Sequence, residues 1–204
     1  MLYSIVRIIS WILLKIFWGM EVKGTENIPN NGAVIIASNH ISAFDPFVLA
    51  ASINREIYFI SKKEAFKSVL GKYLLTNLNA FPVDRENVDV IAFKKALKIL
   101  QEGKILGIFP VGTRSLDGEL QELKLGVIKI AMKTGVPVLP VGISGTHQIC
   151  PRGKKFPILF KHKVIANYGT PQVFQKMLTK NKEYQDESIN LLGEKIKELS
   201  KMNN

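Results

Sequence analysis

The sequence is poor in the residues that build disulfides and zinc sites. It has a single cysteine, Cys150, and its 3 histidines, His40, His147 and His162, stand far apart along the chain. One cysteine excludes an internal disulfide and fits a reducing compartment. The spacing of the histidines matches no zinc motif. A catalytic metal is therefore not expected.

Several signatures of enzyme classes are also missing. The chain has no G-x-S-x-G nucleophile elbow, which argues against a serine hydrolase built on Ser42 beside His40. It has neither a Walker A loop nor a G-x-G-x-x-G, so nucleotide binding is not indicated. No repeat, linker or low-complexity tract divides the 204 residues, a length that suits one compact domain.

Acidic residues are too few to balance the basic ones. The chain has 28 Lys and Arg against 17 Asp and Glu, a formal net charge of +11. Such a protein is drawn to polyanions, whether nucleic acid, anionic lipid or phosphorylated substrates, and charge alone does not choose among them. The basic run "PRGKKFPILFKHK", residues 151–163, is either a solvated face or a surface that meets anionic lipid or an acidic carrier protein.

Residues 1–20, "MLYSIVRIISWILLKIFWGM", predict an amphipathic helix. At 100° per residue, one side of this helix carries Ser4, Arg7, Ser10, Trp11 and Lys15. The other side carries Ile5, Ile8, Ile9, Ile12, Leu13 and Ile16. A helix of this length reaches about 30 Å, enough to span a bilayer, but a buried Arg or Lys costs roughly 2.5–3.5 kcal/mol near the middle of a span. We therefore expect the helix to lie in the membrane interface; the alternative is an ordinary helix packed on a core.

After Gly24 the sequence predicts an α/β fold with a largely parallel central sheet flanked by helices. Short apolar runs alternate with helical patterns. The expected strands are 33–38, 57–61, 80–83, 104–110, 136–143 and 163–169. The expected helices are 46–53, 64–75, 88–101, 125–134 and 182–201.

Residues suited to chemistry follow three of these strands. His40 comes just after the first, Arg85 just after "AFPV", and Gly112, Thr113 and Arg114 just after "KILGIFP". In open α/β sheets, ligands bind outside the carboxyl ends of the strands. All three groups are therefore expected at the same edge of the sheet.

The stretch "NHISAFDP", residues 39–46, places His40 and Asp45 five positions apart. On a helix this spacing separates side chains by about 140°, so the two can meet only across a turn. There the carboxylate would hold one imidazole nitrogen and leave the other free as a base. The alternative is a helix start, with Asp45 as the N-cap and Pro46 at the first helical position; the two interpretations are compatible.

Two further stretches suggest an anion site. "FPVGTRS", residues 109–115, can present backbone N–H groups to an anion while Arg114 grips a phosphate; the alternative is a tight turn with a solvated arginine. "FPVDR" raises the same choice for Arg85, which could instead form a surface salt bridge with Asp84 or Glu86.

Together these stretches resemble the glycerophospholipid acyltransferase family. The family's H-x-x-x-x-D appears as "NHISAFD", its second block as "FPVDR", its third block, usually F-P-E-G-T-R-S, as "FPVGTRS", and its proline block as "VPVLPVGI". The four blocks occur in family order across residues 39–143.

The resemblance implies transfer of a fatty acyl group from acyl-acyl-carrier protein or acyl-CoA to the sn-2 hydroxyl of lysophosphatidic acid, giving phosphatidic acid. It implies His40 and Asp45 as catalytic residues, and substrate binding by Arg85, Gly112, Thr113 and Arg114, without a metal, cofactor or nucleic acid. We expect a membrane-associating helix at 1–24 and an acyltransferase domain at 25–204. The protein would lie at the cytoplasmic face of the cell membrane, in contact with anionic lipid, as a peripheral or monotopic protein.

One departure from the family pattern bears on the acceptor. Val111 stands where the family usually has a glutamate associated with the acceptor site. Two alternatives therefore remain open. The protein is a related acyltransferase for glycerol 3-phosphate or another lysophospholipid, or it is a non-enzymatic basic protein that binds membrane or nucleic acid.

Overall fold

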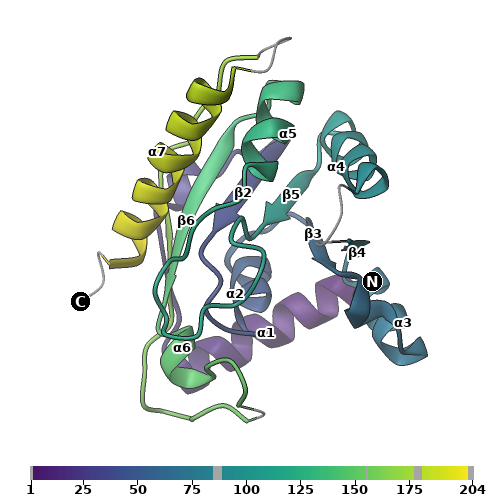
Figure 1. Ribbon diagram of the computed structural model, residues 1–204. Helices are drawn as coiled ribbons and strands as arrows, with labels where there is room; N and C mark the ends of the chain where they lie inside the picture. Colours follow the sequence, from purple (N-terminus) through teal and green to yellow (C-terminus); the bar gives the residue numbers. More distant parts are fainter. Residues whose placement is uncertain (1, 85–88, 155, 177–180, 202–204) are drawn as a thin grey trace.

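A seven-stranded sheet forms the centre of the computed structural model, which describes residues 2–84, 89–154, 156–176 and 181–201. The strand order is β1-β7-β6-β2-β5-β3-β4 (Figure 1). The strands are β1 (Glu21–Lys23), β2 (Val34–Ser38), β3 (Ile57–Lys62), β4 (Ala80–Val83), β5 (Ile105–Ile108), β6 (Val138–Ser144) and β7 (Ile165–Tyr168). β6, β2, β5, β3 and β4 pair in parallel, whereas β7 pairs antiparallel with β6 and parallel with β1. The predicted α/β fold with a largely parallel sheet is confirmed.

Helices cover both faces of this sheet, which explains its apolar strands. The helices are α1 (Leu2–Trp18), η1 (Thr25–Asn27), α2 (Asp45–Ser52), η2 (Lys63–Phe66), α3 (Val69–Asn77), α4 (Val90–Gln101), α5 (Gly126–Thr134), α6 (Thr146–Ile149) and α7 (Lys182–Lys201). α1 and α2 share one hydrophobic core with the sheet, while α4, α5 and α7 share a second core on the opposite face (Figure 1). Every residue of β2 is buried because this central strand is covered on both sides.

The chain departs from the predicted elements at three places. The single helix expected over 64–75 is divided into η2 and α3, because Ser68 is extended between them and its hydroxyl accepts the N–H of Gly71 at 3.0 Å as an N-cap. β1 was not expected from "EVK", which forms a strand only by pairing with β7. α6 is a single short turn after β6 that carries no periodic pattern.

α1 exposes an apolar side that a helix packed on a soluble core would normally bury. Its side with Tyr3, Leu14 and Trp18 is buried, and Arg7 on the inner side donates to the carbonyl of Ile53 at 3.0 Å. The outer side is apolar and exposed, and consists of Ile5, Ile8, Ile9, Ile12, Leu13 and Ile16. Within the described residues, no helix is long and apolar enough to cross a membrane.

Candidate active site

His40 and Asp45 meet across the turn between β2 and α2. The two side chains lie 2.8 Å apart, Nδ1 to Oδ2, and Asp45 is fully buried whereas the His40 side chain is 14% exposed. The turn brings them together because Oδ2 of Asp45 also accepts the backbone N–H groups of Ile41 at 2.7 Å and Ser42 at 2.8 Å. With Nδ1 engaged by the carboxylate, Nε2 is the nitrogen left to act as a base.

Asp45 does not act as the helix N-cap that was the alternative interpretation. It is the first residue of α2, the capping position belongs to Phe44, and no side chain caps the helix. The carboxylate instead points back into the preceding turn. Its second oxygen, Oδ1, accepts the hydroxyl of Thr146 at 2.7 Å, so the buried charge is held by several donors.

The imidazole of His40 is also fixed by its neighbours. It stacks on the ring of Phe109 with a centroid distance of 4.1 Å and an interplanar angle of 20°. Its backbone carbonyl accepts the N–H of Ser115 at 2.8 Å, which ties the loop after β5 to the turn after β2. Asn39 bridges the turn to β6 by exchanging two hydrogen bonds of 2.8 Å with the backbone of Ile143. These contacts hold the ring in one place before any substrate binds.

A polar cavity of about 540 Å³ opens beside His40. Most of its lining lies at or just after the carboxyl ends of β2, β3, β4 and β5, the edge of the sheet at which the sequence predicted a site. The lining residues are His40, Ser61, Lys62, Glu64, Asp84, Val111, Gly112, Thr113, Arg114, Lys124 and Arg152. Gly112, Thr113 and Arg114 thus lie together with His40. Arg85 lies outside the described residues.

The charges of this cavity favour an anion. Lys62 pairs with Glu64 at 3.5 Å, and Lys63 pairs with Asp84 at 2.7 Å, so both acidic groups are already neutralised. A hydrogen bond from its own backbone N–H and the nearby Lys62 ammonium hold the pKa of Glu64 below its usual range. The remaining cations of the lining are Arg114, Lys124 and Arg152.

Lys124 and Arg152 were not found from the sequence. A methyl group added to Gly112 would lie 3.4 Å from Cε of Lys124, so the lysine extends over the glycine of the loop. Arg152 donates to the backbone carbonyl of Arg114 at 3.2 Å. Both lie outside the recognised blocks, and Arg152 is brought to the cavity only by the fold.

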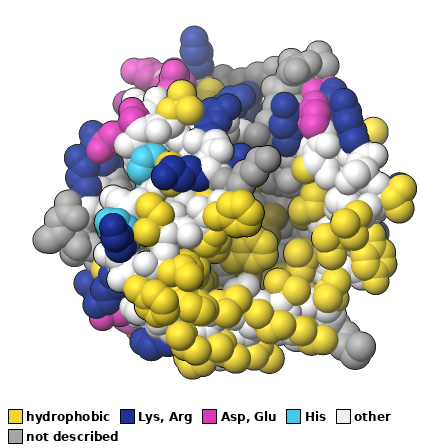
Figure 2. All heavy atoms as spheres, turned by 90° about the horizontal axis from the view of Figure 1, so that it is seen from below, with side chains coloured by type: hydrophobic (Ala, Val, Ile, Leu, Met, Phe, Trp, Pro, Cys, Tyr) yellow, Lys and Arg dark blue, Asp and Glu magenta, His cyan; other side chains and the backbone are white. Residues whose placement is uncertain are grey.

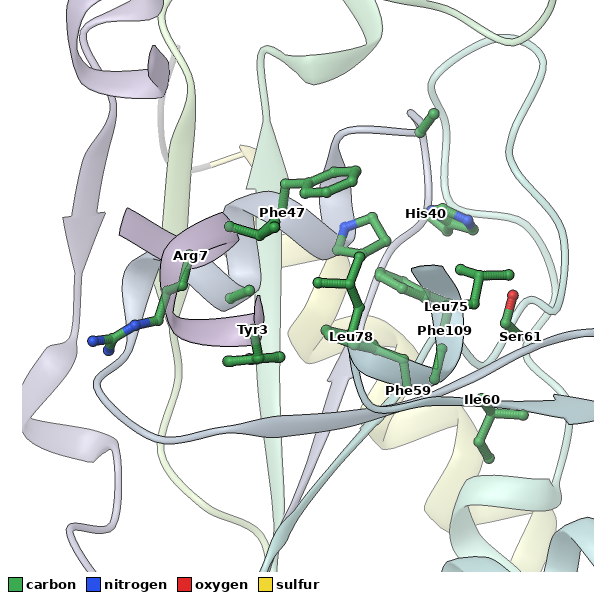
Figure 3. A pocket seen from close by; sticks show the side chains of 15 residues that line it. Tyr3, Arg7, His40, Phe47, Phe59, Ile60, Ser61, Leu75, Leu78 and Phe109 are labelled. Atoms are coloured by element: carbon green, nitrogen blue, oxygen red, sulfur yellow. The ribbon is translucent and has the colours of Figure 1, made fainter. Parts of the chain in front are cut away.

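A second cavity, apolar and of about 240 Å³, is also lined by His40 (Figure 3). It lies between α1, α2, β3 and α3. Its apolar lining includes Val6, Ala43, Pro46, Phe47, Ala50, Phe59, Leu75, Leu78, Ala80 and Phe109. His40 is therefore shared by a cationic cavity and an apolar one.

Comparisons with known proteins agree with this geometry. A family model described as Acyltransferase matches residues 19–144, a range that contains all four sequence blocks. The chain belongs to this acyltransferase family. The resemblance predicted from the sequence is thereby confirmed.

Several relatives of the chain share one name. A 1-acyl-sn-glycerol-3-phosphate acyltransferase of Borreliella burgdorferi is 33% identical over 150 residues, which are 72% of this chain and 58% of the relative. One of Bacillus subtilis is 36% identical over 135 residues, 66% of this chain and 67% of the relative. The chain thus spans less than two thirds of the Borreliella protein.

A solved structure shares the fold of almost the whole acyltransferase chain. The 1-acyl-sn-glycerophosphate acyltransferase from Thermotoga maritima has a TM-score of 0.78 and 27% sequence identity. The similarity covers 99% of this chain and 81% of that one. The likeness includes the region of α1, which lies before the residues that the family model matches.

Proposed function

We propose that this acyltransferase transfers a fatty acyl group from an acyl thioester to the free sn-2 hydroxyl of 1-acyl-glycerol 3-phosphate, which gives phosphatidic acid. The observation that carries the proposal is the position of His40, which lines both the cationic and the apolar cavity. A lysophosphatidic acid and an acyl donor together offer a phosphate, a hydroxyl and long alkyl chains. The relatives described above are named for the same acceptor, which supports the proposal.

His40 supplies the base in the proposed reaction. Nε2 takes the proton from the acceptor hydroxyl as its oxygen attacks the carbonyl carbon of the thioester. The tetrahedral intermediate then collapses, the carbon–sulfur bond breaks, and the leaving thiolate takes the proton from the imidazolium. Asp45 holds Nδ1 and stabilises the imidazolium, and no covalent acyl-enzyme is needed.

The acceptor phosphate would bind in the cationic cavity. Arg114 offers a planar fork that suits phosphate oxygens, and Lys124 and Arg152 add positive charge to the same cavity. Arg85 remains a proposed partner from the sequence block. The cavity lies next to the base, so a phosphate held there would bring the hydroxyl of the same molecule towards Nε2.

The location of the protein is proposed from α1. Its exposed isoleucine side offers an apolar face that a bilayer interface could bury, while the net charge of +11 on the chain provides attraction to anionic lipid. We propose a peripheral or monotopic protein at the cytoplasmic face of the membrane, with acyl-carrier protein or CoA bringing the acyl chain. The division into a membrane-associating helix at 1–24 and an acyltransferase domain at 25–204 remains part of this proposal.

The acyl-transfer test uses the purified chain with labelled acyl thioesters and a panel of acceptors. Acyl-carrier protein and CoA thioesters are compared as donors, and lysophosphatidic acid, glycerol 3-phosphate and other lysophospholipids as acceptors. Preferred formation of labelled phosphatidic acid supports the proposal. Preferred acylation of another acceptor would replace it.

A second acceptor class is favoured by one residue. Val111 lies in the cationic cavity at the position where the family usually has glutamate. Without that carboxylate the loop has one fewer group to orient a glycerol hydroxyl. Glycerol 3-phosphate or a different lysophospholipid is therefore the second candidate acceptor.

A further inference from the structure

α3 is an apolar helix that the rest of the protein does not bury. Its sequence is "VLGKYLLTN", yet it contributes no buried residue to either hydrophobic core. Val69 is 89% exposed and Leu70 is 68% exposed. A helix of 9 residues is marginal without a packed face, so an apolar surface on it calls for a partner.

The position of α3 indicates where that partner lies. Leu75 at the inner side of α3 and Leu78 just after it line the apolar cavity that leads to His40, and Tyr3 and Val6 of α1 line the same cavity (Figure 3). α1 and α3 therefore stand on two sides of one cavity, each with an apolar surface turned outwards. Figure 2 shows hydrophobic side chains gathered over this lower face of the molecule.

The segment 156–160 extends the same face beyond the end of α1. Trp18 donates from Nε1 to the carbonyl of Ile158 at 2.8 Å, and the rings of Phe17 and Phe160 lie 5.1 Å apart. Phe160 is exposed. Its φ is 60°, a backbone conformation that a bulky residue rarely adopts. Phe156, at the start of the segment, is also exposed.

Basic residues occur along the elements that carry this apolar surface. Lys67, just before α3, and Lys72, on α3, are exposed. Lys154 and Lys161, which flank segment 156–160 in the sequence, are exposed as well. Figure 2 shows Lys and Arg side chains at the edges of the hydrophobic area. Such a border attracts anionic headgroups and repels a second copy of the same cationic chain.

We propose that α3 and segment 156–160 enter the interface of an anionic phospholipid membrane together with α1. The three elements form one footprint, with the mouth of the apolar cavity between α1 and α3. An acyl chain could then pass from the bilayer towards His40 without crossing water. This last role rests on the proposed function, whereas the membrane contact itself does not.

The test uses two pairs of residues in matched positions. Val69 and Leu70 begin α3 after the side-chain cap Ser68; Val90 and Ile91 begin α4 after the side-chain cap Asp89. Val90 and Ile91 are likewise exposed, at 55% and 82%, but α4 packs on the opposite face of the sheet. The double variants Val69→Ser with Leu70→Ser, and Val90→Ser with Ile91→Ser, remove similar apolar groups and change no charge.

Co-sedimentation with vesicles of phosphatidylcholine and phosphatidylglycerol measures the effect on the full-length chain. The α3 variant should bind these vesicles about tenfold more weakly or worse, because two apolar side chains no longer leave water. The α4 variant should bind within about twofold of the unchanged protein. Undiminished binding by the α3 variant, or an equal loss in both variants, would overturn the proposal. Thermal melts confirm that each variant is folded.

A fluorescent label gives a second readout that does not depend on affinity. An environment-sensitive fluorophore is attached at Leu70→Cys or at Ile91→Cys, while the buried Cys150 stays protected. Vesicles should shift the emission to the blue at position 70 and not at position 91. A blue shift at position 70 that rises with protein concentration without vesicles would assign α3 to a second copy of the chain instead.

The same labelling applies to segment 156–160. Phe156→Cys should show the blue shift with vesicles, and the absence of a shift would remove this segment from the footprint. Neither measurement requires turnover, so failure of the acyl-transfer assay would leave the membrane result standing. Failure of the membrane result would likewise leave acyl transfer untouched.

Discussion

The hydroxyl of Thr146 donates a 2.7 Å hydrogen bond to Oδ1 of Asp45, although the two residues are 101 positions apart in the chain. Both side chains are fully buried. The bond joins the start of α6, just after β6, to the turn that holds His40. The orientation of the proposed base therefore depends on a residue outside the H-x-x-x-x-D block.

Replacing Thr146→Val should weaken catalysis and lower stability. Valine has nearly the shape of threonine but cannot donate, so one oxygen of a buried carboxylate loses its partner, at a cost of about 1–3 kcal/mol. We expect a lower Tm and a several-fold fall in kcat, measured by thermal melts and by acyl-transfer kinetics. Thr146→Ser keeps the hydroxyl and should restore most of kcat; equal kcat values in both variants would show that the bond does not position the base.

The pair of His40 and Asp45 gives the sharpest kinetic prediction. His40→Ala should abolish turnover in a folded protein, since general-base catalysis typically contributes about 10²–10⁴-fold. Asp45→Asn should stay folded but be severely weakened, because its amide oxygen can replace Oδ2 while the charge that stabilises the imidazolium is lost. Turnover close to normal in folded His40→Ala would rule out His40 as the base.

Lys124 should affect acceptor binding more than the chemical step. Its ammonium lies beside Gly112 in the cationic cavity, so Lys124→Met should raise the KM for lysophosphatidic acid roughly tenfold with a smaller change in kcat. Lys129→Met on the exposed side of α5 removes an equal charge away from the cavity and serves as the control. Equal effects of the two variants would indicate a general effect of net charge rather than a phosphate contact.

The stability of the protein should depend on pH through Asp89, whose side chain caps the start of α4. Hydrogen bonds from the backbone N–H groups of Ala92 and Asp84 lower the pKa of Asp89 below its usual range. A depressed pKa contributes stability that is present above the ordinary range of aspartate and is lost as the pH falls through the lowered value. The Tm deficit of Asp89→Ala should thus be largest near neutral pH and shrink in acid. Asp89→Asn keeps a capping oxygen, so its Tm deficit should be smaller than that of Asp89→Ala but should shrink in acid in the same way, because both variants lack the titrating carboxyl. A constant deficit of Asp89→Ala across pH would contradict the assignment.

The local parts of the site could be predicted from the sequence, but its long-range contacts could not. His40, Asp45 and the 112–114 loop follow strands whose parallel order places them at one edge, and this rule needs no tertiary detail. Thr146 and Arg152 carry no local signal, because their partners are distant in the chain.

The elements show the same division. Apolar runs such as 33–38 predicted the central strands, whereas β1 exists only through its pairing with β7. The pattern of α1 gave its two sides but not which side faces the protein. An apolar side normally predicts the buried one, and α1 reverses this rule with Ile8 and Ile16 exposed.

Val111 is the position where the chain breaks the family pattern inside the cationic cavity. Its side chain is 8% exposed, and the same cavity is lined by Arg114 and Lys124. A glutamate introduced here could pair with one of these cations or accept a hydrogen bond from a glycerol hydroxyl, neither of which valine can do. It would also reduce the positive potential that attracts the acceptor phosphate.

Val111→Glu should therefore change acceptor preference or KM several-fold and leave the dependence on His40 intact. Acylation rates with lysophosphatidic acid and glycerol 3-phosphate are measured beside thermal melts, because an unpaired carboxylate at a buried position would cost a few kcal/mol. Glutamine has the size of glutamate without its charge, so Val111→Gln isolates the effect of the charge. A Val111→Glu protein that melts normally and shows unchanged kinetics with every acceptor would remove position 111 from the acceptor site. A change shared by both variants would assign the effect to the size or the hydrogen bonding of the side chain, whereas a change confined to glutamate would show that charge at this position selects the acceptor.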